Sequence, residues 1–435
     1  MKLLFILHGW PPDSIGGTEI YARRLAKRLS IGNNMRVFCR EADPKRPDYE
    51  IRTDMDDGIE VTKVNYSLKD IKNFRDTYSN KEIARIFDAH LDGIDVPDIV
   101  HIHHLGGLGH LLPDSLDKRG IPYVITLHDF ALTCPHGQRI RDSYSICDKL
   151  AAPDCVECLR PQCKGALFGI FGKSYRYFLK QPEGRQLIEE FWRSSEKIAN
   201  NAKALIAPSR HHARIMEADG FAAAKIHVMP YGYDIGSFAA TRRAQIGLAR
   251  KFGYMGSIIP SKGVHVLIEA FRKLKKDFPE LDVELHIHGP ATTYHGNDSY
   301  FEKLKDRSRG LPVTFHGPYN PETVGDVLSK LDAVVAPSLW WESHGMVVRE
   351  AKLAGLPAIV SAHGAICEAV QDGKNGLLFR PGNAMHLRDK MHILAVTPGL
   401  ADTLGKAPMD ILSIAEDAKA HIELYSQLLK MQGQV

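Results

Sequence analysis

The 435-residue sequence predicts an α/β protein with two parallel β-sheets covered by helices. Short apolar runs alternate with segments of helical periodicity along nearly the whole chain, which is typical of parallel sheets with helices on both faces. The runs form two series, separated by a stretch without strong periodicity at 231–250. The length agrees, since it corresponds to roughly two to three average domains.

The first series begins at the N-terminus with "MKLLFILHGWPP". His8, Trp10 and two prolines end this apolar run before a secretory segment is complete, so it is predicted to be a buried strand. Further strands are predicted at 35–40, 59–64, 98–103, 122–127, 204–209 and 225–230. No run reaches the roughly 18 apolar residues of a membrane span, so we expect a cytoplasmic protein, or one peripheral on the cytoplasmic face of a membrane.

The second series predicts strands at 251–257, 282–289, 312–317, 332–338 and 357–362. We therefore expect one α/β domain over 1–232 and a second over 233–414. The last segment, 415–435, contains a helix with its apolar residues on one side. Its periodicity alone does not say on which domain it packs.

Composition restricts the class of partner. The chain is 44% hydrophobic and 25% charged, as is ordinary for a globular protein. Its 56 basic and 52 acidic residues leave a net charge of +4. This charge is too small to indicate nucleic acid as a partner, although it suits an anionic ligand or a lipid surface.

Three loops are placed to bind a ligand, because ligands of open α/β sheets bind beyond the carboxyl ends of the strands. Gly16 and Gly17 follow the first strand of the first series and precede a helix. Lys262 and Gly263 hold the same position in the second series. The third loop opens the stretch "WWESHGMVVREAKLAGLP", residues 340–357.

This third stretch places two carboxylates around a helix start. A run of helix formers follows Gly345 and ends at Gly355, so Glu342 precedes the helix and Glu350 lies inside it. The first N–H groups of a helix attract anions, and carboxylates accept hydrogen bonds from hydroxyl groups. A sugar nucleotide combines both features. In the alternative interpretation, Glu342 interacts only with the helix dipole and Glu350 is a solvated helix position.

Four stretches of the second series carry motifs that occur in this order in a known enzyme family. They are "YMGSIIPSKGVHVLIEAF", "VTFHGPYN", "DAVVAPSLWWESHGMVVREAKLAGLPAIVSAHGAICEAV" and "DGKNGLLFRPGN". In these stretches the chain resembles glycosyltransferase family 4, a group of retaining nucleotide-sugar transferases, and Glu342 and Glu350 match the E-x7-E motif of the family. In the first series the resemblance rests on the Gly16-Gly17 loop, "DIVHIHH" and "TLHDF".

The resemblance implies a GT-B fold: two Rossmann-like domains facing across a cleft, with 415–435 packing back on the N-terminal domain. The domain over 1–232 would bind the acceptor, a sugar or a lipid-linked molecule. The domain over 233–414 would bind a nucleoside-diphosphate sugar. No cofactor is expected for catalysis, and the product would keep the anomeric configuration of the donor.

The resemblance also implies roles for charged residues. Glu342 would contact hydroxyl groups of the donor sugar, Glu350 would accept hydrogen bonds from the ribose, and Lys262 would neutralise the diphosphate. An oxygen of the leaving diphosphate would assist in removing the acceptor proton. Catalysis would then be mainly electrostatic, with Lys262 and the helix N-terminus stabilising the leaving group.

Further donor contacts are implied by backbone groups. The turn Ser343, His344, Gly345, Met346 and Val347 would bind the distal phosphate and sugar, and Gly16 and Gly17 would approach that phosphate from the other domain. The chain departs from the family at Ser257, where many members have an arginine.

Histidines at strand ends are candidates for the acceptor site. His128 in "TLHDF" matches a family histidine near the reacting carbon, and we predict a catalytic and acceptor-binding role for it. A histidine ending a buried strand is as readily structural, but Asp129 beside it favours a site. His101 and His103 share one strand face. With no third metal ligand nearby, His103 is predicted to line the acceptor site.

Rival activities fit less well. A glycosidase pair is disfavoured because the resemblance places Glu350 at the ribose. A dehydrogenase would need a G-x-G-x-x-G loop, which neither "GWPPDSIGG" nor "GSIIPSKG" provides. A nucleotide-sugar epimerase of this fold and a non-catalytic sugar-nucleotide binding protein stay open. So does the role of 165–181, which is aromatic and basic and either contacts a lipid-linked acceptor or covers the core.

Five of the seven cysteines cluster just after His128. Cys155 and Cys158 have the two-residue spacing that thiolate metal sites favour. Cys134 and Cys147 are the first choices to complete a structural zinc site, with Cys163 as the alternative. A loop of reduced thiols without a metal is the competing interpretation, and a disulfide is disfavoured in a reducing compartment.

Overall fold

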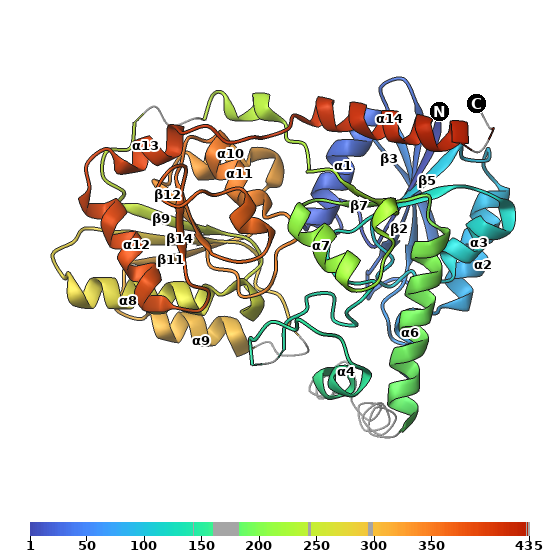
Figure 1. Ribbon diagram of the computed structural model, residues 1–435, viewed down its shortest axis with the longest axis horizontal. Helices are drawn as coiled ribbons and strands as arrows, with labels where there is room; N and C mark the ends of the chain where they lie inside the picture. Colours follow the sequence, from blue (N-terminus) through green and yellow to red (C-terminus); the bar gives the residue numbers. More distant parts are fainter. Residues whose placement is uncertain (142, 160–181, 242–244, 295–298, 432, 434–435) are drawn as a thin grey trace. The chain divides into compact units, whose positions relative to one another are not determined.

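The computed structural model describes all residues except 142, 160–181, 242–244, 295–298, 432 and 434–435. The chain forms two compact units, each built around one β-sheet (Figure 1). Unit 1 comprises Met1–Gln138, Lys149–Gly232 and Leu412–Val435, and unit 2 comprises Arg139–Asp148 and Tyr233–Ile411. Neither unit is therefore continuous in sequence.

Unit 1 contains an eight-stranded sheet in the order β3-β4-β2-β1-β5-β6-β7-β8. Its strands are β1 (Lys2–Leu7), β2 (Asn34–Glu41), β3 (Ile51–Asp56), β4 (Ile59–Asn65), β5 (Ile99–Ile102), β6 (Tyr123–Thr126), β7 (Ala204–Ala207) and β8 (Ile226–Val228). Its helices are α1 (Gly17–Leu29), α2 (Lys81–Asp92), α3 (Leu112–Arg119), α4 (Ala152–Leu159), α6 (Pro182–Asn201), α7 (Arg210–Ala218) and α14 (Ile414–Met431), with short 3-10 turns at η1 (Phe74–Thr77) and η4 (Ala223–Lys225).

The centre of this sheet positions the ligand-facing loops. From β1 the chain moves outward through β2 to β4 and then returns to β5 on the other side of β1. The strand order thus reverses between β1 and β5, the usual ligand position in such sheets. The strand β1 is buried along Leu3–Leu7 because its apolar run is covered on both faces.

The edge strand β3 was not predicted from sequence. It pairs antiparallel with β4, and its residues alternate between exposed and partly buried, so it lacks a continuous apolar run. Asp57 and Gly58 join the two strands with positive φ angles of 49° and 82°. An Asp-Gly pair between strands is a strong hairpin signal, and it marks this strand better than hydrophobicity does.

Unit 2 contains a six-stranded parallel sheet in the order β11-β10-β9-β12-β13-β14. Its strands are β9 (Lys251–Met255), β10 (Glu284–His288), β11 (Val313–Gly317), β12 (Ala333–Ala336), β13 (Ala358–Ser361) and β14 (Leu377–Phe379). Its helices are α8 (Val264–Asp277), α9 (Ser299–Ser308), α10 (Val324–Leu328), α11 (Met346–Leu353), α12 (Ala384–Val396) and α13 (Leu400–Lys406), with 3-10 turns at η5 (Ile235–Phe238), η6 (Pro260–Lys262), η7 (Pro321–Thr323) and η8 (Ala365–Glu368).

Two features of unit 2 differ from the expectations. The edge strand β14 was missed because three residues are too few for a recognisable apolar run. The stretch 231–250, expected as a hinge, includes Tyr233 and Phe238, which are buried in unit 2. The strand order of this sheet reverses between β9 and β12, so the loops after these two strands are expected to face a ligand.

The C-terminal helix α14 packs on unit 1, as the resemblance implied. The Tyr21 hydroxyl of α1 donates a hydrogen bond to Asp417 Oδ2 at 3.0 Å, and the Gly232 N–H donates to the same oxygen at 2.8 Å. His101 Nδ1 lies 2.7 Å from the Tyr425 hydroxyl. The helix therefore returns to the first unit after the second is complete.

The segment Arg139–Asp148 corrects the expected domain boundaries, which placed all of 1–232 in the first domain. It groups with unit 2. An antiparallel bridge joins Ile140 and Ile146, and the buried Arg139 guanidinium donates hydrogen bonds to the carbonyls of Cys147 and Asp148 at 3.0 Å. It also lies 5.9 Å from the ring centroid of Trp341, a cation–π distance. A contact between residues so far apart in sequence cannot be predicted from local sequence patterns.

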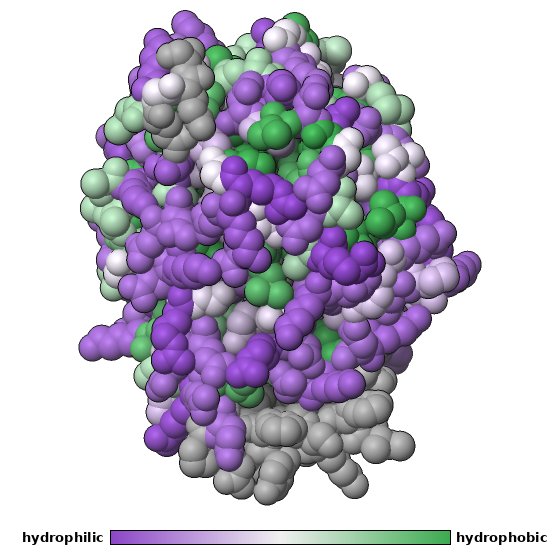
Figure 2. Space-filling model, turned by 90° about the vertical axis from the view of Figure 1, so that its right-hand side faces the viewer, coloured by the Kyte–Doolittle hydropathy of each residue, from purple (hydrophilic) through white to green (hydrophobic). Residues whose placement is uncertain are grey.

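The face drawn in Figure 2 is mainly hydrophilic, with hydrophobic residues scattered over it in small groups. This agrees with helices such as α2, whose Ile83, Ile86, Phe87 and Leu91 point inward. Among the helices that the structure describes, none is both long and apolar enough to cross a membrane.

Candidate active site

Lys262 and Glu342 meet in unit 2 at the point where its strand order reverses. Lys262 ends η6 after β9, and Glu342 lies in the loop between β12 and α11. Lys262 Nζ lies 2.7 Å from Glu342 Oε1, and the ammonium is also 5.2 Å from the Trp340 ring centroid. Two residues predicted to bind opposite parts of a donor are thus already paired.

One carboxylate oxygen of Glu342, Oε1, accepts hydrogen bonds from several side chains. Ser338 Oγ donates to Oε1 at 2.5 Å and Trp340 Nε1 donates at 3.0 Å, in addition to Lys262. The residue is only 8% exposed, so these donors satisfy a buried carboxylate oxygen and hold the orientation of the side chain. Among the residues that the structure describes, none is hydrogen-bonded to Oε2, which is available to a ligand.

Glycines allow the loops of unit 2 to approach closely. Gly263 has a φ of 72°, and a Cβ there would lie 2.0 Å from the Pro337 carbonyl oxygen. Gly345, the N-cap of α11, has a φ of 76°, and a Cβ would lie 3.0 Å from Ile366. Both positions favour glycine, because an L side chain would be strained at these φ angles, and at Gly263 it would also clash with the backbone.

The other residues of unit 2 that were predicted for the donor belong to the loops after β9 and β12 and to α11. Ser343, His344 and Glu350 are buried, and Glu350 lies within α11. Met346 and Val347 form the first turn of α11 after Gly345, and the Ser257 carbonyl accepts a hydrogen bond from the Tyr254 hydroxyl at 2.7 Å. Their roles toward a donor stay predictions.

Sequence reasoning did not identify the residues that support Glu342. Besides Ser338 and Trp340, His363 contributes indirectly, since its Nε2 donates to the Ser338 carbonyl at 2.8 Å. Burial lowers the pKa of His363, which keeps its ring neutral. The tryptophan next to the E-x7-E motif was the only available signal, because an indole N–H in a buried loop needs an acceptor.

In unit 1, the Gly16-Gly17 loop encloses a carboxylate that the sequence analysis overlooked. Glu19 is buried in the first turn of α1. It lies 3.1 Å from His8 Nε2 and accepts a hydrogen bond from Ser14 Oγ at 2.7 Å. A Cβ on Gly16 would lie 2.7 Å from Glu19 Oε2. Gly16 therefore lies directly against this carboxylate, and its expected role toward phosphate stays a prediction.

Glu19 is expected to make the stability of unit 1 sensitive to acid. Burial raises the pKa of Glu19, but the interactions with His8 and Ser14 outweigh burial and lower the pKa from the usual 4.5 to about 2. Because the pKa of Glu19 is lower in the folded protein than in the unfolded chain, its ionised form stabilises the fold above about pH 4.5. This stabilisation is lost as the pH falls from 4.5 toward 2. At neutral pH this corresponds to roughly 3 kcal/mol. The difference between the urea unfolding midpoints of wild type and Glu19→Gln should stay constant from pH 7 to about pH 5 and shrink as the pH falls from about 4.5 toward 2; a difference that does not change over this lower range would contradict this assignment.

The histidines after β5 and β6 form a buried network. His128 Nδ1 lies 2.5 Å from the Tyr231 hydroxyl, and His128 Nε2 lies 2.9 Å from His103 Nδ1. His101 Nε2 lies 2.6 Å from Thr126 Oγ1. Burial lowers the pKa of His128 to about 3 and that of His101 and His103 well below the usual range. His128 is thus neutral with both nitrogens occupied. Its predicted catalytic role stays a prediction, and this geometry favours a structural one.

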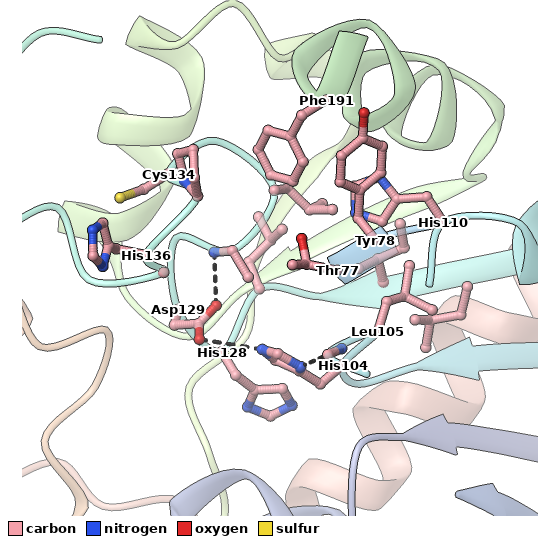
Figure 3. Close-up of a pocket in the computed structure, with 18 of the residues that line it drawn as sticks. Thr77, Tyr78, His104, Leu105, His110, His128, Asp129, Cys134, His136 and Phe191 are labelled. Carbon is pink, nitrogen blue, oxygen red and sulfur yellow. Dashed lines mark hydrogen bonds and ion pairs between the residues drawn. The ribbon is translucent and has the colours of Figure 1, made fainter. Parts of the chain in front are cut away.

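A cavity of about 260 Å³ opens beside this network, and another pair of residues faces it (Figure 3). His104 Nε2 lies 3.2 Å from Asp129 Oδ2. Burial opposes both charges, but mutual attraction raises the pKa of His104 and lowers that of Asp129. Sequence reasoning treated Asp129 only as a neighbour of His128, whereas the structure turns Asp129 toward the cavity.

The cysteines predicted to bind zinc are distributed over both units. Cys134, Cys155 and Cys158 belong to unit 1, Cys147 belongs to unit 2, and Cys163 lies outside the described residues. Within the described ranges, no group of three or more histidine, cysteine, aspartate or glutamate side chains has a metal-binding arrangement.

The zinc site stays a prediction that elemental analysis decides. If Cys155 and Cys158 bind zinc with further ligands, the purified protein should contain about one equivalent of zinc, and chelation should lower its unfolding temperature. Less than about half an equivalent of zinc or iron, with all thiols titratable in the native protein, would make this a loop of reduced thiols.

Comparisons with known proteins agree with these features. Residues 15–237 match the family described as Glycosyltransferase Family 4, and residues 243–407 match Glycosyl transferases group 1. A D-inositol 3-phosphate glycosyltransferase from Kribbella flavida is 26% identical over 430 residues, 93% of this chain and 89% of that protein. One from Corynebacterium jeikeium is 28% identical over 265 residues, which cover 57% of this chain and 62% of that protein.

Solved structures confirm the GT-B fold class. Anabaena HepE in complex with UDP and glucose gives a TM-score of 0.64 at 17% identity, with 100% of both chains covered. Sucrose-phosphate synthase from Thermosynechococcus elongatus gives 0.65 at 19% identity, with 100% of this chain and 98% of that chain covered. The family match over 15–237 takes in more than half of the 435 residues. The protein therefore belongs to glycosyltransferase family 4.

Proposed function

We propose that the protein transfers a sugar from a nucleoside-diphosphate sugar to an acceptor hydroxyl group, with retention of the anomeric configuration. The observation that carries this proposal is the Lys262–Glu342 pair in unit 2. It places a cation and a carboxylate with one available oxygen where the strand order reverses, next to the N-terminus of α11. The cation and the helix N-terminus suit a diphosphate, and the carboxylate suits the hydroxyl groups of a sugar.

The donor would extend from the α11 N-terminus toward the loop after β9. Backbone N–H groups of Ser343–Val347 and the Lys262 ammonium would bind its phosphates. Glu342 Oε2 would accept hydrogen bonds from the transferred sugar, and the buried Glu350 would accept those of the ribose. The complexes of HepE with UDP and with UDP-glucose support a nucleotide-sugar donor.

The chemistry in this proposal relies on electrostatics. As the bond from the anomeric carbon to the diphosphate oxygen breaks, negative charge grows on the leaving group. Lys262 and the α11 N-terminus would stabilise that charge, each such donor contributing about 3 kcal/mol. The departing oxygen would take the proton of the acceptor hydroxyl, whose oxygen bonds to the same face of the sugar. Glu342 would hold the sugar during this exchange.

The acceptor would bind to unit 1. The curated relatives are named D-inositol 3-phosphate glycosyltransferases, so a phosphorylated polyol is one acceptor class to test. A lipid-linked acceptor at the cytoplasmic face of a membrane is another, suggested by the aromatic and basic segment 165–181. That segment lies outside the described residues, so vesicle co-sedimentation is its direct test.

The stereochemical outcome is the first test of this function. Purified protein incubated with UDP-, GDP- and ADP-sugars and a panel of acceptors should release nucleoside diphosphate, and the product should keep the anomeric configuration of the donor. Proton NMR measures this from the coupling constant of the anomeric hydrogen. An inverted product would refute the retaining mechanism, and an epimerised free sugar without transfer would indicate an epimerase.

A further inference from the structure

The cavity in unit 1 has a polar side and an aromatic side (Figure 3). The loops after β5 and β6 supply the polar side. The aromatic side consists of Phe74, Tyr78 and Phe191, whose ring centroids lie 5.3 to 5.7 Å from one another. These rings belong to a buried apolar cluster, so they form a fixed wall. A ligand that fits needs hydroxyl groups on one side and C–H groups on the other.

Asp129 is held in one orientation, and its carboxylate still faces the cavity. Its Oδ1 accepts a hydrogen bond from the Ala131 N–H at 2.8 Å, and Oδ2 lies 3.2 Å from His104 Nε2. The Gly106 N–H points at His104 Nδ1 at 2.9 Å, so Nδ1 is the acceptor and Nε2 carries the proton that Asp129 receives. The side chain of Asp129 remains 29% exposed. Each carboxylate oxygen can accept a further hydrogen bond.

A second polar group lines the same cavity. His103 is 1% exposed, and its Nε2 has no hydrogen-bond partner among the described residues, whereas its Nδ1 contacts His128. A buried nitrogen without a partner costs free energy unless a ligand or water satisfies it. The cavity thus offers a charged acceptor at Asp129 and an unsatisfied nitrogen at His103, both suited to hydroxyl groups.

We propose that this cavity binds an uncharged saccharide as the acceptor, and that Asp129, positioned by His104, accepts a hydrogen bond from one of its hydroxyl groups. The apolar face of the sugar, or an apolar substituent on it, would lie against Tyr78 and Phe191. This inference rests on the proposed function and specifies its acceptor. A phosphate group at this position would meet the Asp129 carboxylate, and the described residues lining the cavity include no lysine or arginine to offset that repulsion.

The test compares Asp129→Asn with wild type. Phenyl glycosides of common hexoses serve as probes in saturation-transfer NMR without donor, beside inositol 3-phosphate. Wild type should bind at least one phenyl glycoside better than inositol 3-phosphate, and the variant should bind it about tenfold or more weakly, because a neutral amide replaces a charged acceptor. A deoxy analogue lacking the contacted hydroxyl should bind both proteins equally. In transfer assays, the acceptor KM should rise more than kcat falls.

Asp92→Asn is the matched control, since Asp92 is a surface carboxylate of unit 1 that pairs with Arg119. Equal glycoside affinity in the two variants, absence of glycoside binding to wild type, or stronger binding of inositol 3-phosphate would each overturn the inference. Glycoside binding that depends on Asp129 in a protein that turns over no nucleotide sugar would refute only the proposed function. An unchanged unfolding temperature in Asp129→Asn verifies that the fold is intact.

Discussion

Replacing Lys262 with alanine is expected to weaken binding of a nucleoside diphosphate about 10- to 100-fold, while the affinity for the bare nucleoside changes little. A hydrogen bond between charged groups contributes about 1.5–3 kcal/mol, and the ammonium acts on phosphate. The structure adds a second reason. Without Lys262, the carboxylate of Glu342 would keep only the donors Ser338 and Trp340 and would repel the incoming diphosphate. Calorimetry with both ligands measures the difference.

Two further variants sharpen this test. Lys273→Ala removes a half-buried lysine of α8 that pairs with Glu269, and it should leave both affinities unchanged. The double variant Lys262→Ala/Glu342→Gln should regain part of the lost diphosphate affinity, because the repelling charge is gone. Equal losses for nucleoside and diphosphate in Lys262→Ala would show that Lys262 supports the fold and does not bind phosphate.

Glu342→Gln is expected to separate binding from turnover. Glutamine has the same shape and can still accept the hydrogen bonds of Ser338 and Trp340, but it has no charge. Turnover should fall about 100-fold, comparable to the loss of one preorganised electrostatic contact. The affinity for a nucleoside diphosphate should be unchanged or up to about tenfold higher, because Lys262 is no longer partly neutralised at 2.7 Å.

Steady-state kinetics and calorimetry on the same preparations provide the measurement. Glu269→Gln is the control, since this half-buried carboxylate pairs with Arg272 and Lys273 of the same helix, α8. If Glu342→Gln lost diphosphate affinity and turnover in parallel, the carboxylate would act through the loop conformation, and its assignment to the transferred sugar would fail.

Much of the fold was predictable because buried parallel strands leave continuous apolar runs, as in Lys2–Leu7. The edge strands of the two sheets were not predictable, because β3 has no continuous apolar run and β14 has only three residues. The segment Arg139–Asp148 belongs to unit 2, where Arg139 contacts Trp341 and Tyr144 contacts His265, both more than a hundred residues away in sequence. Periodicity contains no information about such a contact.

Part of the arrangement around Lys262 and Glu342 was predictable as well. Spacing and a helix start located Lys262 and Glu342, and the structure brings them together. That they form an ion pair could not be predicted, because their loops follow different strands of the sheet. In unit 1, the contacts of the neighbouring residues His128 and Asp129 differ from those expected. Both residues line the cavity, but both ring nitrogens of His128 contact buried residues, whereas the Asp129 carboxylate pairs with His104; a sequence gives no such side-chain contacts at an irregular strand end.

The discontinuity of both units has a consequence for protein synthesis. During translation, 139–148 emerges long before Tyr233–Ile411, the rest of the unit to which it belongs. Likewise, Tyr21 and His101 contact Asp417 and Tyr425, which are synthesised 396 and 324 residues later. A chain synthesised only as far as Gly232 therefore cannot complete either core, and it would expose the surfaces that α14 covers. Domains excised at the linker should aggregate, whereas the two fragments expressed together should reassemble.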